Sequence, residues 1–438
     1  MRISGSASTT PTTANRKPDL RPSAVVYCEG NFAGIDGKTA NGLVRSSERY
    51  RILAIIDSTQ AGQDAGQVLD GANAGIPILS SLAEVMLVTG RLPALFIFGL
   101  APLSGLMSRP ERAAVLEAVL AGLDIVSGLH EFLNDDPEIS AAARSRSVTL
   151  LDVRRPRPTK DLRMFDGAID SVDCVRIAVL GTDGAIGKRT TSTILTKSLN
   201  DAGIHTVMVG TGQTGLMQGA AYGVALDAIP AQFGVGELEG AVVEAWQGEH
   251  PAVIVIEGQG ALSHPAYLSS TVVLRASRPH AVIMQHAPAR VMLSDYPAVA
   301  MPSAASERDL IEQFGKTRVI GITINHEDMT DSEVSASQAE YAETLGLPAT
   351  DPLWRAPSEL VDMVTGAFPE LLRPTTASSR EAPQPAHRDR PGQDRGQQSV
   401  PGDPAGPPRD RGHRGDQGGL GPACCGRGHA GRRGHPTR

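Results

Sequence analysis

One segment of this 438-residue chain has residue types and spacing that suit phosphate binding. It reads Gly-Thr-Asp-Gly-Ala-Ile-Gly-Lys-Arg-Thr-Thr, after an apolar run at 175–180 and before a helix-like stretch at 191–202. In such a P-loop, backbone N–H groups, the helix dipole and a Lys charge all face a phosphate. We therefore predict a phosphate site, with a solvent-facing lysine, made by Gly181, Thr182, Asp183, Gly184, Gly187, Lys188, Arg189, Thr190 and Thr191.

The motif departs from the usual P-loop at two positions. Thr182 stands where the first Gly is usual, and Arg189 follows Lys188 where a Ser or Thr would bind Mg²⁺. Thr190 or Thr191 would then have to supply the metal-binding hydroxyl. A P-loop binds a diphosphate, which both ATP and coenzyme A carry, so the motif leaves nucleotide hydrolysis open.

Two later apolar runs end in polar residues that we expect at the same sheet edge as this loop. The run at 252–257 ends in Glu257, and an acid in that place is suited to hold Mg²⁺ beside the phosphates. The run at 319–325 ends in Asn325, whose amide either contacts a nucleotide base or ends the strand as a turn residue.

A second Gly-Lys step, Gly37-Lys38-Thr39, follows the first apolar run at 24–28. Its glycines lack the Gly-x-Gly-x-x-Gly order of a dinucleotide fingerprint. Asp57 ends the next run, where a Rossmann-like unit places a ribose-binding acid, although a turn or helix cap would use the same residue. We predict that these four residues contact a cofactor.

These motifs require parallel strands, and the chain alternates short apolar runs with helix-like stretches as a parallel sheet covered by helices would. We expect one series of strands at 24–28, 52–57, 94–98, 124–126 and 148–153, with a helix at 109–121. We expect a second series at 175–180, 206–210, 252–257, 281–285 and 319–325.

The predicted fold class is α/β, with two domains. A Rossmann-like, CoA-binding-like parallel-sheet domain at 23–155 is followed by a linker at 156–164 and a P-loop NTPase-like α/β domain at 165–373. The ends, 1–22 and 374–438, are predicted to be flexible tails. Residues 374–438 hold 13 Gly but no aromatic residue, and cannot bury enough apolar surface to order themselves.

Charge and composition narrow the function class. The formal net charge is −7, although residues 374–438 carry 11 Arg against 6 acids, so the remaining chain is more acidic still. An acidic body argues against nucleic-acid binding. The sequence has no run of 18 apolar residues, so we expect no membrane partner. Four scattered Cys, including the tail pair Cys424-Cys425, fit a cytoplasmic protein. We expect a homo-oligomer with a small-molecule substrate.

The residues described so far resemble known families. The P-loop region is similar to the dethiobiotin synthetase group, which implies a phosphate site with Lys188 and Glu257 and a base contact at Asn325. The Gly-x-Pro step at 75–77 and the runs that follow it are similar to the coenzyme A-binding domain of succinyl-CoA synthetases.

The two domains together resemble a bacterial family often labelled epimerase/dehydratase, whose named activity is D-glutamate N-acetylation. The resemblance covers about 22–372. It rests on the segments GKTANGLVR (37–45), AIIDS (54–58), SGLHEFL (127–133), GTDGAIGKRTT (181–191), GTGQTG (210–215), EGQGALSHPAY (257–267) and HAPAR (286–290).

That resemblance implies acetyl transfer from acetyl-CoA to the amino group of an acidic amino acid, most simply D-glutamate. Such chemistry needs a general base, donors for the developing oxyanion and cations for the substrate carboxylates. His264, His286 and Glu257 are the candidate bases, although each His could instead be a capping or packing residue. Candidate substrate contacts are Arg290, Arg45 and Gln213, with Lys38 as a further cation.

Two alternatives stay open at this point. An ATP- and Mg²⁺-dependent ligase or kinase would use Lys188, Thr190 and Glu257, the last two as metal ligands. A non-catalytic protein that senses a nucleotide or CoA would bind without turnover. A nicotinamide oxidoreductase is disfavoured, because the glycine order is wrong.

Overall fold

The first domain is a six-stranded parallel sheet. A computed structural model describes residues 19–372, so the predictions for 1–18 and for the 374–438 tail, with Cys424 and Cys425, lie outside the described residues. The strand order is β3-β2-β1-β4-β5-β6, and every pairing is parallel. The strands are β1 (Ser23–Tyr27), β2 (Arg51–Ile56), β3 (Ile78–Leu79), β4 (Leu95–Phe98), β5 (Asp124–Ser127) and β6 (Leu150–Asp152).

Helices connect these strands as parallel topology requires. They are α1 (Lys38–Arg45), α2 (Ala65–Asp70), α3 (Leu82–Thr89), α4 (Arg109–Ala121) and α5 (Pro137–Arg146). The helix predicted at 109–121 is confirmed. Ser108 and Glu111 form a capping box at its start, Pro110 occupies the first turn, and Gly122 ends it in the left-handed conformation.

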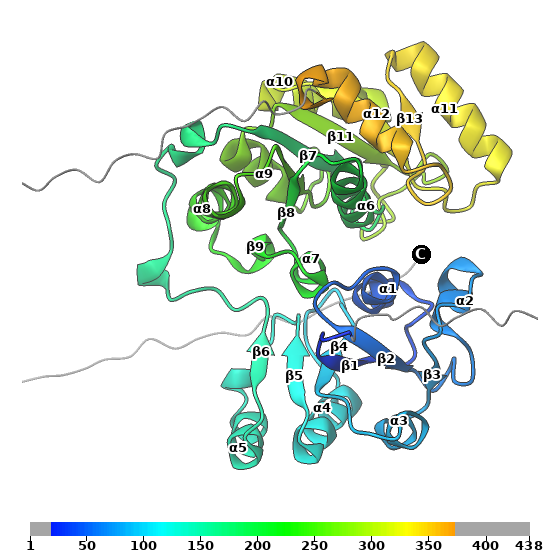
Figure 1. Cartoon of the computed structure of the whole chain (residues 1–438), viewed down its shortest axis with the longest axis vertical. Helices are drawn as coiled ribbons and strands as arrows, with labels where there is room; N and C mark the ends of the chain where they lie inside the picture. Colours follow the sequence, from blue (N-terminus) through cyan, green and yellow to red (C-terminus); the bar gives the residue numbers. More distant parts are fainter. Residues whose placement is uncertain (1–18, 373–438) are drawn as a thin grey trace, which may run out of the picture. The chain divides into compact units, whose positions relative to one another are not determined.

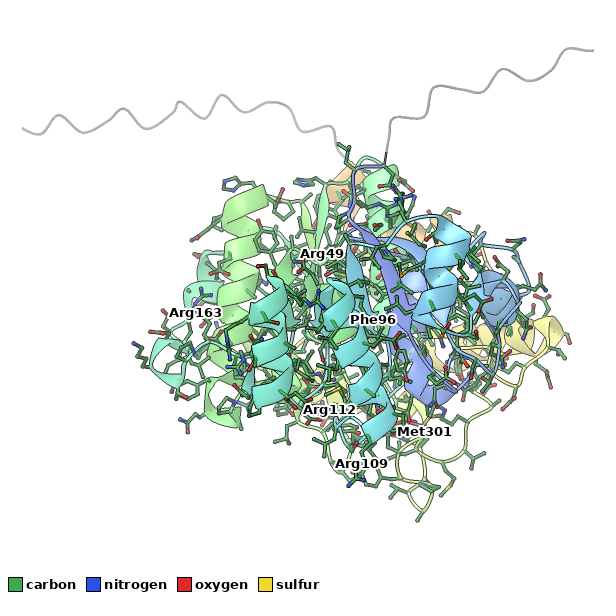
Figure 2. All side chains as sticks on the ribbon, turned by 90° about the horizontal axis from the view of Figure 1, so that it is seen from below. Arg49, Phe96, Arg109, Arg112, Arg163 and Met301 are labelled. Carbon is green, nitrogen blue, oxygen red and sulfur yellow. The ribbon has the colours of Figure 1, made fainter. Side chains whose placement is uncertain are left out.

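Aromatic side chains fill the interior of the first sheet. Phe96 stacks on Tyr27 with ring centroids 5.6 Å apart, and Tyr27 in turn stacks on Phe98 at 5.8 Å. Figure 2 labels Phe96 within this layer, whereas Arg109 and Arg112 lie on α4. This packed layer holds β1 and β4 together, and so positions the loops that follow these strands.

The second domain (Figure 1) is a parallel sheet. Its seven strands lie in the order β13-β12-β11-β7-β10-β8-β9. Strand β7, which leads into the P-loop, lies between β10 and β11, so three loops converge beside it. The strands are β7 (Val175–Gly181), β8 (Thr206–Gly210), β9 (Tyr222–Gly223), β10 (Val253–Glu257), β11 (Ala281–His286), β12 (Val319–Ile324) and β13 (Ala349–Thr350).

Seven α-helices accompany this sheet in the part of the chain that the structure describes: α6 (Lys188–Asp201), α7 (Gln213–Gln218), α8 (Ala231–Glu249), α9 (Ser269–Ser277), α10 (Ala304–Gly315), α11 (Asp331–Leu345) and α12 (Ser358–Ala367). Helix α6 begins at Lys188, three residues before the predicted start at Thr191. The reason is that the helix starts directly behind the positive-φ Gly187.

The carboxyl edges of the two sheets face each other. Thr39, in α1, lies 2.8 Å from Thr214 of α7 between the two hydroxyl oxygens. Met217 of α7 is fully buried in the core of the first domain. Gly128, just after β5, packs against Gln213. Loops of both sheets therefore meet at one boundary within a single compact unit.

The α/β fold class with a Rossmann-like sheet followed by a P-loop sheet is confirmed. None of the helices in residues 19–372 is both long and apolar enough to cross a bilayer.

Candidate functional site

The P-loop leaves backbone donors without acceptors. Helix α6 begins at Lys188 behind Gly187, whose φ of 101° favours glycine, and no side chain caps the helix. Among the described residues, the backbone N–H groups of Ala185, Ile186 and Gly187 meet no hydrogen-bond acceptor. Three consecutive free N–H groups at the start of a long helix form a concave anion-binding surface.

Lys188 lies inside this loop. Only 5% of its surface is exposed, and its ammonium donates to the carbonyl oxygen of Asp183. Burial lowers the pKa of Lys188 to about 8, although Asp183 and Glu257 oppose the shift, so the ammonium stays charged at neutral pH. The prediction that Lys188 faces solvent is wrong, because the loop backbone itself offers the ammonium an acceptor.

Asp183 ties the P-loop to the segment that follows β11. Its Oδ1 accepts from the N–H of Gly184 at 2.6 Å, and its Oδ2 accepts from Arg290 Nη1 at 2.7 Å and from the N–H of Ser294 at 2.8 Å. Arg290 also donates two bonds of 2.6 Å to Glu327. Its fork is thus engaged by the protein's own carboxylates, and binding a substrate carboxylate would require one of these pairs to break.

His264 approaches Asp183 from the loop after β10. The Nδ1 atom accepts from the N–H of Ala266 at 3.2 Å, which assigns the ring proton to Nε2. Nε2 is buried, has no partner within residues 19–372, and lies 4.0 Å from Asp183 Oδ1. Burial lowers the pKa of His264, so the ring is neutral at pH 7. In this tautomer His264 is a hydrogen-bond donor at Nε2 rather than a base.

His286 ends β11 beside the P-loop. Its Nδ1 lies 2.9 Å from Thr182 Oγ1, and burial lowers the pKa of the imidazole to about 4. A base with so low a pKa holds a proton poorly at neutral pH. The Thr182 contact therefore gives His286 a role in ordering the loop.

Glu257 is the third candidate base. It ends β10, is 5% exposed, and accepts at Oε2 from the N–H of Thr211 at 3.0 Å and of Gly212 at 3.4 Å. Burial raises the pKa of Glu257, against those N–H groups and the charges of Arg189 and Lys188. A carboxylate with a raised pKa is a stronger base than one in water, and Glu257 lies beside the P-loop cations.

The P-loop lacks the usual magnesium ligand. A guanidinium, Arg189, occupies the place of the metal-binding hydroxyl, and Thr191 Oγ1 donates to Gln285 Oε1 at 2.5 Å. Thr190 is half-buried, and its hydroxyl meets no hydrogen-bond partner among the described residues. No group of three His, Cys, Asp or Glu in residues 19–372 is arranged to hold a metal. These donors fit an anion better than Mg²⁺.

The candidates of the first domain lie elsewhere. Asp57 is fully buried and accepts from the N–H groups of Gly30 at 3.0 Å and Phe32 at 2.9 Å, so it stabilises the loop that follows β1. Lys38, behind Gly37, is exposed, whereas Thr39 contacts the second domain. Arg45 is exposed and forms a 2.7 Å ion pair with Asp70.

The remaining predicted contacts are Gln213 and Asn325. Gln213 is buried at the domain boundary, against Gly128. The Oδ1 of Asn325 accepts from the N–H of Glu327 at 3.0 Å, which is the turn geometry that we weighed against a base contact.

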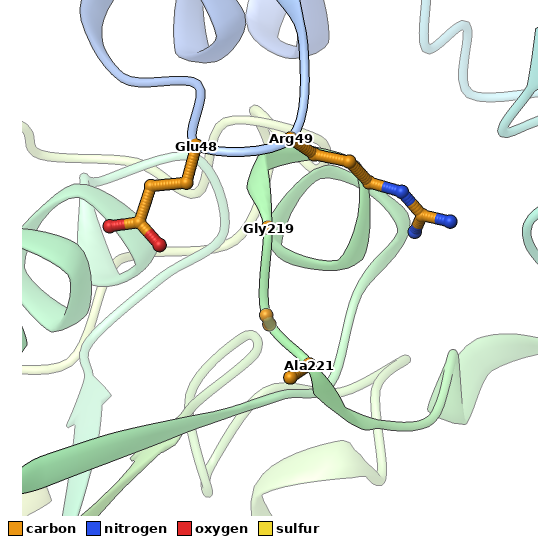
Figure 3. Close-up of a pocket in the computed structure, with 5 residues that line it drawn as sticks. Glu48, Arg49, Gly219 and Ala221 are labelled. Atoms are coloured by element: carbon orange, nitrogen blue, oxygen red, sulfur yellow. The ribbon is translucent and has the colours of Figure 1, made fainter. Parts of the chain in front are cut away.

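Two cavities open along the boundary between the domains. One, of about 490 Å³, is lined by Glu48 and Arg49 of the first domain and by 219–221 of the second (Figure 3). The other, of about 350 Å³, includes Arg154, Leu216 and Glu237 in its lining. Neither is lined by Lys188, whose own loop is closed around it.

Comparison with known proteins identifies relatives of both halves. The Rossmann-like model of the domain of unknown function DUF1611 matches residues 58–156, and its P-loop model matches 163–361. A protein of Tritonibacter scottomollicae named D-glutamate N-acetyltransferase is 30% identical over 304 residues, which cover 68% of this chain and 88% of that protein.

A protein of the same name from a Pseudoalteromonas species is 29% identical over 264 residues, covering 59% of this chain and 77% of the relative. The crystal structure of a DUF1611 family protein from Anabaena variabilis aligns with a TM-score of 0.73 at 28% identity. That alignment covers 79% of this chain and the whole of that structure. The same two-domain arrangement thus extends across relatives with little sequence identity.

Proposed function

The chain belongs to the DUF1611 family, and on that premise we propose that it is an N-acetyltransferase acting on an acidic amino acid, with D-glutamate as the first candidate and acetyl-CoA as donor. The observation that carries the proposal is the P-loop itself. Free N–H groups at 185–187 and the buried Lys188 suit a diphosphate, while Arg189 replaces the magnesium ligand. The names of the two relatives support the acetyl transfer.

The diphosphate of CoA would be held by the P-loop. The N–H groups of Ala185, Ile186 and Gly187, which have no acceptor among the described residues, would donate to its oxygens, and Lys188 would neutralise its charge. His264 adds an Nε2–H donor that no described residue satisfies. When bound, acetyl-CoA supplies the acetyl group as a thioester, whose carbon–sulfur bond breaks as the substrate nitrogen bonds to the acetyl carbon.

Glu257 is the general base of the proposed reaction. An amino acid carries an ammonium at neutral pH, which must lose a proton before its nitrogen can attack. Glu257 takes that proton, because burial raises its pKa toward that of a useful base and Oε1 is left without a hydrogen bond in residues 19–372. The second proton that the nitrogen loses ends on the released thiol, so protons and bonds balance.

The test uses the full chain with acetyl-CoA and D-glutamate, with and without Mg²⁺–ATP, while free thiol and N-acetylated product are measured. We expect thiol and product in equal amounts without ATP. If thiol is not released but ADP forms from ATP, the ligase or kinase reading, with Thr190 and Glu257 as metal ligands, replaces the proposal. Binding of CoA without any product would make the protein a sensor.

A further inference from the structure

Arg189 is held at the domain boundary by residues of both domains. Its Nη1 donates to Gln218 Oε1 at 2.5 Å. The Nε2 of the same Gln218 donates to the carbonyl oxygens of Gly42 at 2.6 Å and Ser46 at 2.8 Å, both in or next to α1. The amide orientation of Gln218 is thereby fixed, and the guanidinium has one position against the first domain.

Gly42 makes room for that guanidinium. A Cβ at Gly42 would clash with Arg189 Nη1 and lie 2.7 Å from its Cζ and 2.8 Å from its Nη2. A glycine inside a helix costs about 1 kcal/mol relative to alanine, and nothing in the backbone of α1 requires it. The close approach of Arg189 accounts for the glycine.

The guanidinium has no carboxylate partner. Nε and Nη2 of Arg189 donate to none of the described residues, and no acid of residues 19–372 is within ion-pair distance. Arg45 and Arg290, by contrast, are both paired with acids. Arg189 is part-buried, and its Nε and Nη2 atoms have no protein acceptor among the described residues, so this edge of the guanidinium is available to an anion at the domain boundary.

The ionised carboxylate of Glu257 and the guanidinium of Arg189 carry opposite charges. Glu257 and Arg189 influence each other electrostatically, and burial lowers the pKa of Arg189 to about 10, opposed by Glu257, which leaves it charged. Both groups contact α7: Glu257 Oε2 lies against Gly215, and Arg189 bonds Gln218, one helical turn further on. A carboxylate and a guanidinium at one helix complement a molecule that carries both an ammonium and a carboxylate.

We propose that Arg189 binds the side-chain carboxylate of the acidic amino acid at the domain boundary, while Glu257 faces its amino group. The inference rests on the proposed function and adds the residue that selects acidic substrates. A planar guanidinium can hold a carboxylate through two parallel bonds, which an ammonium cannot. Gly42 and Gln218 are positioning residues for it.

The test compares the full-length wild type with Arg189→Gln and Arg189→Lys by steady-state kinetics. We expect Arg189→Gln to raise the KM for D-glutamate about 10- to 100-fold, the effect of a lost charged hydrogen bond, with the KM for acetyl-CoA within about twofold. Arg189→Lys should recover only part of the loss. With D-glutamine, which keeps the α-carboxylate but has an amide in place of the side-chain carboxylate, the KM of the wild type and of Arg189→Gln should differ much less.

Gly42→Ala is the second variant, because it keeps the charge but displaces the guanidinium; it should raise the same KM by a smaller factor. Arg275→Gln is the matched control, since it removes an exposed charge from α9 in the same domain. It should change neither KM.

Two results would overturn the inference. If Arg189→Gln raises the KM for acetyl-CoA and not that for D-glutamate, Arg189 holds the cofactor, and the acetyltransferase proposal stands without it. If the wild type forms no product at all, the proposed function fails. Calorimetry with glutarate then tests the carboxylate site at Arg189 separately. Glutarate binding that is lost in Arg189→Gln supports the carboxylate site, whereas equal or absent binding rejects it.

Discussion

Gly37-Lys38 and Gly187-Lys188 occupy the same topological position in the two domains. Each Gly-Lys step starts the helix that follows the first strand in its domain's sequence, α1 after β1 and α6 after β7. Lys38 is exposed, whereas Lys188 is 5% exposed and bonded to its own loop. The same dipeptide thus gives a solvated charge in one domain and a buried one in the other.

The loops before the two lysines explain the difference. In the first domain, the N–H groups of Gly30 and Phe32 donate to the buried Asp57, and those of Gly34 and Gly37 donate to carbonyls of the same loop. In the second domain, the N–H groups of residues 185–187 meet no described acceptor. The first loop uses most of its N–H groups for its own folding, whereas the second leaves three consecutive N–H groups available to an anion.

The largest effect is expected at Glu257. Glu257→Gln keeps the shape of the side chain but cannot accept a proton, so kcat should fall about 10²- to 10⁴-fold, the usual contribution of a general base. Because burial raises the pKa of Glu257, wild-type activity should rise with pH through that raised pKa and then level. The variant's pH profile should lose this limb; an unchanged kcat would assign the base elsewhere.

Replacing each of the two lysines by Met tests directly whether only the second loop binds an anion. Lys188→Met should weaken CoA binding about 10- to 100-fold, or about 1.5–3 kcal/mol for a lost charged hydrogen bond, without unfolding the protein. Lys38→Met should change the affinity by less than about threefold, because its ammonium lies outside the closed loop. Calorimetry with CoA measures both, and equal losses would mean that the two domains share the ligand.

Local patterns predicted most of the fold. Helix α4 was placed at 109–121 because Pro110 and an apolar face mark it, and the strand at 206–210 was placed to the residue. The strands β9 and β13 were not predicted, since two residues show no periodicity, and β3 was indicated only by the Gly-x-Pro step before it. They form because the longer neighbouring strand offers an edge of unpaired backbone N–H and C=O groups.

The site was predicted less completely, for a physical reason. The P-loop motif is local, so the sequence locates Lys188. The partners of Arg290, however, are Asp183, 107 residues away, and Glu327, and no spacing rule connects them. The sequence predicts Arg189 as part of the phosphate site and as a departure from the magnesium-binding pattern. It does not predict the contact with Gly42, because that contact exists only once the domains have met.

Asp57 tests the first-domain loop of this comparison, whose N–H groups it accepts. Asp57→Asn replaces an acceptor of buried N–H groups by an amide that can satisfy only part of them, and should lower the free energy of unfolding by about 2–3 kcal/mol. The affinity for CoA should not change. Hydrogen exchange of residues 28–37 would rise in the variant if Asp57 holds this loop; a lost CoA affinity with normal stability would instead restore it as a ligand contact.

His286 gives the smallest effect, and its sign follows from burial. The pKa of His286 is lowered to about 4, while the unfolded chain titrates near its ordinary value of about 6.5. Between these values the unfolded state binds more protons, so stability should fall by about 2 kcal/mol from pH 7 to pH 5 and stop falling below about pH 4. His286→Asn, which does not titrate but can still bond Thr182, should lose about 2 kcal/mol less over that interval.

Both Trp residues, Trp246 and Trp354, lie in the second domain, so urea unfolding followed by their fluorescence reports on the domain that contains His286. Equal pH dependence in the two proteins would show that the pKa of His286 is the same in the folded and unfolded states, and that the imidazole is less enclosed than its contacts indicate.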